Sequence, residues 1–331
     1  MRRLLILTLV VAGCSKPSPG TAQHAAPDTA HAPTARTADA RAAKSTSGDR
    51  GQTKRVRPPV VKTKREAARP RAAPDPKTLH QRALVVDLHI DTLWRVRKNG
   101  WDLTAPPPTS QAAPAQLLAG GVNAQFFAVW IPPAELNPRA VAMAIIDIFD
   151  QRIIGAGGRF VRATTVAAIR KAVAQGKIAA LLGLEGARPL EGEPSLLEDF
   201  VKRGVRYVAL TWNETNVFGT GADGKKRRGI TSKGRALVRE MNRLRVLVDI
   251  SHANQATFWD VITTSERPVI ASHSNAASLR AHRRNLNDVQ LWAIRDSGGV
   301  VGLNFHSTYL VAKGRATVAD LTAHALHLPD H

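Results

Sequence analysis

The sequence predicts an α/β fold of the (β/α)8 TIM-barrel type that is truncated before its eighth strand. From residue 84 onward, short apolar runs alternate with amphipathic stretches, which is the pattern of an α/β protein. Several of these runs are almost continuously apolar, as parallel strands covered on both faces are. Polar residues suited to chemistry follow the ends of the runs, where barrel enzymes place their active sites.

Seven apolar runs are the predicted strands, whereas a closed barrel of this kind needs eight. They cover residues 84–88, 124–130, 178–184, 207–210, 246–250, 269–271 and 300–303. The helices predicted between and after them cover residues 139–155, 195–202, 232–243, 255–263, 288–296 and 321–328. Ser195 and Glu198 resemble a capping box at the start of the second helix. With 331 residues, 44% of them hydrophobic, the chain can bury one barrel-sized core.

Residues 1–14 resemble a bacterial lipoprotein signal peptide. Met1 is followed by two arginines, by an apolar run too short to span a membrane, and by small residues before Cys14. We expect Cys14 to be lipidated and to anchor the protein in the cell envelope, and Ser15 favours the outer membrane. The alternative is an ordinary secretory signal with an incidental cysteine. Cys14 is the only cysteine, so no intrachain disulfide can form.

Residues 15–77 are predicted to be a disordered basic linker rich in Ala, Pro and Thr, because they hold too few large apolar side chains to offset ordering. The whole chain carries a net charge of +21, and residues 1–77 hold 16 Lys and Arg against 5 Asp and Glu. About half the charge therefore lies outside the barrel of residues 78–331, and we predict no nucleic-acid partner. The linker is either a solvated tether or a segment that contacts anionic lipid or cell-wall polymer.

Five residues at four strand ends form a candidate metal site: His89, Asp91, Glu185, His252 and His273. Residues two apart on a strand point to the same side, so His89 and Asp91 can reach one ion. Imidazole nitrogens and carboxylate oxygens suit a borderline divalent ion such as zinc. Taken singly, His89 and Asp91 could be an accidental pair, Glu185 a surface carboxylate and His252 a hydrogen-bonded core residue. Their common position at successive strand ends favours the metal site.

The motifs around these residues are similar to those of the membrane (renal) dipeptidase family, zinc peptidases of the amidohydrolase-like superfamily. They occur in the family's order and cover residues 84 to about 327. They are Val86-Asp-Leu-His-Ile-Asp91, Gly183-Leu-Glu-Gly186, Leu210-Thr-Trp-Asn213, Val248-Asp-Ile-Ser-His252, Pro268-Val-Ile-Ala-Ser-His-Ser-Asn275, Arg283-Arg-Asn285 and Gly298-Gly-Val-Val-Gly-Leu-Asn-Phe305. The resemblance implies a zinc-dependent barrel that cleaves dipeptides and tolerates a D-residue on the C-terminal side.

The resemblance also implies roles for single residues. His89 and Asp91 would bind one zinc ion, His252 and His273 a second, and Glu185 would bridge the two and serve catalysis, with a metal-activated hydroxide attacking the peptide carbonyl.

Three further residues are candidate substrate contacts. Arg284 would bind the substrate carboxylate, and its alternative is a surface arginine. Trp212 stands where the family often has a histidine, and His306 is either a site residue or an exposed loop residue.

The family's eighth-strand Asp has no counterpart in the sequence. Asp330 lacks a strand before it and a glycine after it, so it is not a replacement, and His324 and His327 are expected on a solvated or supporting helix face. The resemblance therefore predicts a chain truncated relative to the family, with two zinc ions in the family and one here.

Three functions stay open at this point. The first is a lipid-anchored zinc dipeptidase of the cell envelope, and the second is a truncated, catalytically impaired relative with exposed strand edges that could pair in a homodimer. The third is a metal-dependent amidohydrolase of different specificity. The residue pair His89 and Asp91 speaks against the third, because cyclic-amide hydrolases more typically carry two histidines at that place.

Overall fold

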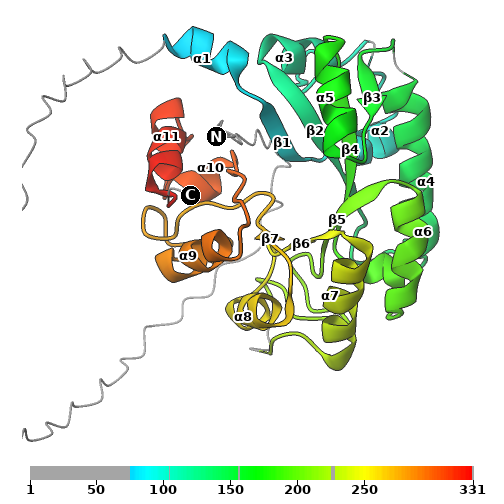
Figure 1. Ribbon diagram of the computed structural model, residues 1–331, viewed down its shortest axis with the longest axis vertical. Helices are drawn as coiled ribbons and strands as arrows, with labels where there is room; N and C mark the ends of the chain where they lie inside the picture. Colours follow the sequence, from blue (N-terminus) through cyan, green and yellow to red (C-terminus); the bar gives the residue numbers. More distant parts are fainter. Residues whose placement is uncertain (1–74, 104, 156, 225–227, 330–331) are drawn as a thin grey trace, which may run out of the picture. The chain divides into compact units, whose positions relative to one another are not determined.

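The computed structural model describes residues 75–329 except 104, 156 and 225–227 (Figure 1). The predicted signal peptide with Cys14, residues 15–74 of the linker predicted over 15–77, and Asp330 lie outside the described residues. The last three residues of that predicted linker belong to the start of a helix, Pro76–Arg82, which Asp75 caps. Within these ranges, no helix is both long enough and apolar enough to cross a membrane.

A curled, all-parallel sheet forms the centre of the fold, as the alternating pattern predicts (Figure 1). Its strands follow the order β1-β2-β4-β5-β6-β7, with β3 paired to β4 beside this path. The strands are β1 (Val85–Ile90), β2 (Val122–Trp130), β3 (Phe160–Arg162), β4 (Ile178–Glu185), β5 (Val205–Ala209), β6 (Leu247–Asp249) and β7 (Val269–Ile270). The sheet is a half-barrel, and the described residues contain no strand that closes it against β1.

One predicted strand is wrong, and one strand of the sheet was not predicted. Residues 300–303 do not form a strand; Val301 makes only an isolated parallel bridge to Ala271. The short strand β3 was not predicted. It pairs with the first residues of β4, whereas β5 pairs with the last ones along the same edge. Because β3 has three residues and only one of them is buried, it carries no readable apolar run.

The helices and short helical turns lie before, between and after the strands in sequence. They are α1 (Pro76–Arg82), α2 (Thr92–Asn99), α3 (Pro114–Ala119), α4 (Pro138–Ile148), the π-helix η1 (Phe149–Ile154), α5 (Val166–Ala174), η2 (Arg188–Leu190), η3 (Pro194–Leu196), α6 (Leu197–Lys202), α7 (Ser232–Leu244), α8 (Gln255–Thr264), α9 (Asp288–Asp296), α10 (Ser307–Leu310) and α11 (Val318–His327). All six predicted helices are found, and the predicted helix 139–155 is α4 continued by η1.

The predicted capping box of Ser195 and Glu198 is wrong. The residue before α6 is Leu196, which makes no side-chain cap, and Ser195 lies in the preceding 3-10 turn. The Glu198 carboxylate pairs instead with Arg243 of α7. Side-chain caps do begin the next helices, where Thr231, Asn254 and Asn287 accept backbone N–H groups.

The two faces of the sheet carry separate groups of buried apolar side chains. Phe127 and Leu182 face the larger group, in which α2, α4 and α6 also pack, while Phe126, Leu181 and Tyr207 face the smaller one. Since side chains alternate along a strand, Trp130 and Glu185 at the ends of β2 and β4 lie on the face of the smaller group. This face is the one on which the polar residues gather.

Candidate metal centre

Glu185 lies at the middle of a buried group of three histidines. Its Oε1 is 2.8 Å from His252 Nε2 and 3.7 Å from His273 Nε2, and its Oε2 is 3.4 Å from His89 Nε2. The carboxylate ends β4, His89 lies in β1, and the other two residues follow β6 and β7. The Glu185 side chain is 4% exposed. The strand ends therefore bring together four of the five predicted ligands around one carboxylate.

Asp91 is the fifth predicted ligand and stands at the rim of this group. Its Oδ1 is 3.5 Å from His89 Nε2, and its side chain is 37% exposed. It occupies the residue before α2 but makes no side-chain cap there. Ligand atoms of His89, Glu185 and His273 all lie within 4.8 Å of one another.

Each of the three imidazoles is held through Nδ1 by another side chain. His252 Nδ1 is 2.7 Å from Asn213 Oδ1, His273 Nδ1 is 2.7 Å from Ser272 Oγ, and His89 Nδ1 is 2.9 Å from the Tyr207 hydroxyl. Partners of this kind fix ring orientation and tautomer in metal sites.

The partners determine the tautomer of two of the rings. Asn213 Oδ1 can only accept, so His252 Nδ1 carries the proton. The Ser272 hydroxyl donates to a carboxylate oxygen of Asp249 at 2.6 Å, which leaves its own oxygen to accept from His273 Nδ1–H. The Nε2 lone pairs of His252 and His273 therefore face Glu185, an arrangement of acceptors that a cation among them would stabilise.

The electrostatics of the group favour neutral imidazoles at His252 and His273 beside an ionised Glu185 carboxylate. Burial alone would lower the pKa of His89, but Tyr207, Glu185 and the contact with Asp91 outweigh it and raise that pKa. Burial and the nearby Arg284 guanidinium lower the pKa of His252 to about 4. Burial, together with charge on His89, lowers the pKa of His273 as well. Burial alone would raise the pKa of Glu185, but charge on His89 outweighs it and holds that pKa below its usual range. Neutral imidazole and carboxylate are the forms that bind zinc.

Arg284 is buried beside the group, whereas its neighbour Arg283 is exposed. Arg284 Nη2 lies 2.9 Å from His252 Nε2, and its Nε and Nη1 are buried without a hydrogen-bond partner among the described residues. Arg283 pairs with Asp223 at the surface. The guanidinium of Arg284 thus keeps two unused donors buried beside the site, which suits the binding of an anionic group.

Trp212 lies beside the metal group within a row of aromatic rings. Its ring centroid is 6.0 Å from that of His252 and 5.2 Å from that of Trp130. Trp130 in turn meets the edge of Trp94 in α2 at 5.1 Å. Trp130 is level with Glu185 on the neighbouring strand. The tryptophans form an apolar wall at one side of the group.

His306 lies partly buried at the start of α10. Its Nδ1 accepts from the backbone N–H of Thr308 at 3.3 Å, and its ring lies 5.1 Å from that of Tyr309. Tyr309 also lies under the Arg284 guanidinium at 5.7 Å. His306 is thus tied to the site through Tyr309. Within the described residues, no hydrogen bond or ring contact joins it to the three ligand histidines.

His324 and His327 dock the helix α11, as expected of a supporting face. His324 is 1% exposed; its Nδ1 accepts from Ala276 N–H at 3.1 Å and its Nε2 faces Leu310 O at 3.2 Å. His327 Nε2 lies 2.8 Å from the Asp288 carboxylate. Both rings are occupied by these contacts.

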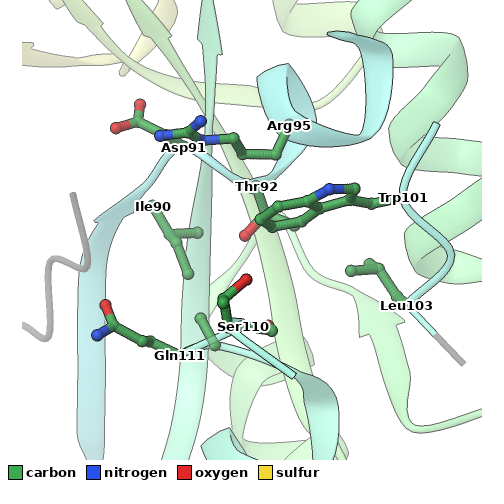
Figure 2. A pocket seen from close by; sticks show the side chains of 10 residues that line it. Ile90, Asp91, Thr92, Arg95, Trp101, Leu103, Ser110 and Gln111 are labelled. Atoms are coloured by element: carbon green, nitrogen blue, oxygen red, sulfur yellow. The ribbon is translucent and has the colours of Figure 1, made fainter. Parts of the chain in front are cut away.

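A cavity of about 60 Å³ opens beside Asp91. Figure 2 shows Asp91 and Arg95 at its upper rim, with Trp101, Ser110 and Gln111 around the space below. A volume of this size holds one or two water molecules. It extends the site on the Asp91 side.

Four residues of the site had no predicted role: Tyr207, Asn213, Asp249 and Ser272. The last three lie in the quoted motifs, which was a usable signal: Asn213 follows Trp212, Asp249 lies three residues before His252, and Ser272 directly precedes His273. No signal in the sequence marked Tyr207, because a tyrosine in an apolar strand is normally interpreted as a residue of the hydrophobic core.

The family model for membrane dipeptidases, peptidase family M19, matches residues 75–330. An uncharacterized protein in the pqqA 5′ region of Klebsiella pneumoniae is 38% identical over 185 residues, which cover 54% of this chain and 68% of that protein. The chain spans only 50% and 38% of the length of the next two curated relatives, from Acinetobacter calcoaceticus and Schizosaccharomyces pombe.

Two solved structures share the fold. A metallo peptidase from Rhodobacter sphaeroides, liganded with a phosphinate mimic of the dipeptide L-Ala-D-Ala, has a TM-score of 0.68 and 30% identity, with 74% of this chain and 81% of that chain covered. A dipeptidase described as a metallo peptidase of family M19 has a TM-score of 0.68 and 32% identity, with 74% and 80% covered.

Proposed function

The chain belongs to the membrane dipeptidase family, peptidase family M19, and on that premise we propose that it is a zinc-dependent dipeptidase. The single observation that carries the proposal is the convergence of the His252 and His273 Nε2 atoms, with that of His89, on the buried Glu185 carboxylate. When bound, zinc supplies Lewis-acid activation of water and of the peptide carbonyl.

The two oxygens of Glu185 face different partners, which supports a site for two ions in place of the one that the missing eighth-strand Asp led us to predict. Oε2 faces His89, beside which Asp91 lies, and Oε1 faces His252 and His273. We assign His89 and Asp91 to one ion, His252 and His273 to the other, and Glu185 to both. The donor set of neutral imidazoles and carboxylates fits zinc.

The substrate side of the proposal rests on Arg284. Its free Nε and Nη1 atoms are buried, and an unpaired buried guanidinium is costly unless an anion meets it. The C-terminal carboxylate of a dipeptide is such an anion, with planar geometry that a guanidinium fork matches. The ligand of the Rhodobacter structure mimics L-Ala-D-Ala, which supports a small dipeptide, with an L- or D-residue at its C-terminal end, as the substrate class here. Trp212 would contact that substrate, and His306 would support its position through Tyr309.

Hydrolysis by the purified full chain tests the proposal. After loading with zinc, the protein should cleave L-Ala-L-Ala and L-Ala-D-Ala and should fail on the amide of L-Ala-D-Ala, which lacks the carboxylate that Arg284 would bind. Glu185→Ala should abolish turnover, while Glu193→Ala, at an exposed carboxylate paired with Lys233, should not. Turnover that persists in Glu185→Ala, or that prefers cyclic amides to dipeptides, would contradict the proposal.

We propose further that Cys14 is lipidated and that residues 15–77 tether the enzyme to the outer membrane of the cell envelope. The support is the signal-like sequence of residues 1–14. Radiolabelled palmitate should enter the wild-type protein and Ser15→Ala but not Cys14→Ser, and Cys14→Ser should leave the membrane fraction. The homodimer stays a prediction, which sedimentation equilibrium of the purified protein would measure.

A further inference from the structure

We propose that Asp249 is a positioning residue for the metal centre: it sets the spacing of His252 and His273 and holds the His273 ring in the tautomer that leaves Nε2 free. The inference rests on the proposed function, since it takes these imidazoles as metal ligands. Asp249 would not itself contact the metal or the substrate.

The Asp249 carboxylate joins the ends of two strands. It ends β6, is 2% exposed, and accepts four hydrogen bonds. Its Oδ1 accepts from Ser251 N at 3.0 Å, Ser251 Oγ at 2.7 Å and Ser272 N at 2.9 Å, and its Oδ2 accepts from Ser272 Oγ at 2.6 Å. Ser251 and Ser272 are the residues directly before His252 and His273.

These hydrogen bonds connect the segments after β6 and β7, beyond the last backbone pairing of the two strands. The regular ladder between β6 and β7 ends with Asp249 opposite Ile270, and one further backbone bond joins Ile250 N to Ile270 O. Beyond that point the segments that follow β6 and β7 are linked through Asp249 and through Ser251 Oγ, which accepts from His273 N at 3.0 Å and lies 3.1 Å from Ser272 Oγ. The carboxylate therefore controls how far apart the two following histidines lie.

The same carboxylate determines which residue donates the hydrogen bond between Ser272 and His273. Because a carboxylate can only accept, Ser272 donates to it and must accept from His273 Nδ1–H at 2.7 Å. The proton is thus kept on Nδ1, and the Nε2 lone pair faces Glu185.

The charge of Asp249 is not needed to hold the two strands together. Its four donors are neutral, and no Lys or Arg of the described residues forms a salt bridge with it. A buried carboxylate without a cationic partner is costly. A cation between the nearby imidazoles would offset that cost, whereas a merely structural role would be served as well by an uncharged acceptor.

Asp249→Asn tests whether the carboxylate makes His273 the donor in its hydrogen bond with Ser272. Three donors meet at Oδ1, so the amide oxygen must stay there and the NH2 group must take the place of Oδ2. The NH2 group then donates to Ser272 Oγ, so the Ser272 proton can no longer be donated to residue 249. Ser272 is then free to donate to His273 Nδ1, and the proton of His273 is no longer held on Nδ1. We expect a 10- to 100-fold loss of zinc affinity, the range for lost partners of metal-binding histidines, measured by competition with a chelator.

Two further readouts separate positioning from plain structural support. The visible spectrum of the cobalt-substituted protein should change in Asp249→Asn, and the imidazole ¹⁵N signals of the zinc-free protein should show a loss of the His273 Nδ1–H tautomer. Ser272→Ala removes the hydroxyl and should weaken zinc binding in the same direction. Asp260→Asn is the matched control, since Asp260 accepts from Ile230 N at 2.9 Å in another part of the fold.

The outcomes are decisive in each case. Wild-type zinc affinity and an unchanged cobalt spectrum in both Asp249→Asn and Ser272→Ala would overturn the inference and leave the proposed function intact. If Asp249→Asn does not fold, Ser272→Ala decides alone. If the wild-type protein binds no zinc, the proposed metal centre fails and the inference fails with it.

Discussion

His252 Nε2 and His273 Nε2 lie 2.8 Å apart. The Nδ1 atoms of both rings are occupied by acceptors, so the two facing nitrogens both present lone pairs. Arg284 Nη2 donates to one of them from 2.9 Å, and Glu185 Oε1 adds a third acceptor. The lone pairs of these acceptors repel one another, so a bound cation would stabilise the group.

Removing the metal should lower the thermal stability of the protein. Zinc at 100 times its dissociation constant would stabilise the folded state by about 2.7 kcal/mol, because the unfolded chain does not hold these ligands together. Differential scanning calorimetry with and without a chelator measures the difference. Equal melting temperatures in zinc and in chelator would contradict a resident ion, and magnesium serves as the control salt.

Glu185→Gln should lose both metal and activity. The amide keeps the size of the side chain but removes the charge that faces all three rings. We expect zinc affinity to fall by at least about 100-fold, the upper range for partners that do not touch the ion, with a matching loss of kcat. Elemental analysis of the purified variant gives the stoichiometry, and Glu193→Gln should keep the wild-type value.

Arg284→Met should impair substrate binding while zinc binding persists. Loss of a charged hydrogen bond to the substrate carboxylate costs about 1.5 to 3 kcal/mol, so kcat/KM for L-Ala-D-Ala should fall about 10- to 100-fold. Steady-state kinetics on dipeptides give this value. The adjacent Arg283→Met is the matched control, because that side chain is exposed and pairs with Asp223. An equal loss in both variants would argue against the substrate role of Arg284.

Gly183→Ala should disturb the metal centre from the middle of β4. A Cβ at this position would overlap the Tyr207 ring, whose hydroxyl holds His89 Nδ1. Overpacking costs about 1 to 3 kcal/mol, and displacement of Tyr207 should weaken zinc binding on the His89 side. Denaturant melts and zinc titration measure the two effects. Tyr207→Phe, which removes only the hydroxyl, should weaken zinc binding with a smaller loss of stability.

Acid should weaken the docking of α11 through His324. Burial lowers the pKa of His324, and nearby His327 lowers it further, while the Leu310 carbonyl and Asp320 oppose the change. A folded-state pKa below the unfolded value means that the stabilisation is present above the unfolded pKa and is lost as the pH falls through the folded pKa. The protection of α11 amides against hydrogen exchange, measured relative to the intrinsic exchange rate at each pH, should therefore fall as the pH drops below about 6.5. In His324→Gln this pH dependence should disappear, whereas in His327→Gln it should remain.

The sequence predicted the ligands better than the surroundings that hold them. His89, Glu185, His252 and His273 follow apolar runs, and the geometry of parallel sheets alone implies that such positions meet at one edge. Tyr207 could not be predicted, because its contact with His89 depends on which face of β5 turns inward and on the space above Gly183. The strand β3 was missed since three residues cannot show a period. Residues 300–303 were overpredicted because their backbone bonds to the residues after β7 amount to one isolated bridge, between Val301 and Ala271, and not to a strand.

The four ligands at the centre of the site are spread over the chain from β1 to the residue after β7. No two of them are close in sequence, so the site has a high contact order. A nascent chain that has emerged only as far as β5 carries His89 and Glu185 but neither of the histidines that face Oε1. Tight metal capture must therefore come late in folding, after the long-range strand pairing is complete, and the rate of zinc uptake by refolding protein would report on the assembly of the whole sheet.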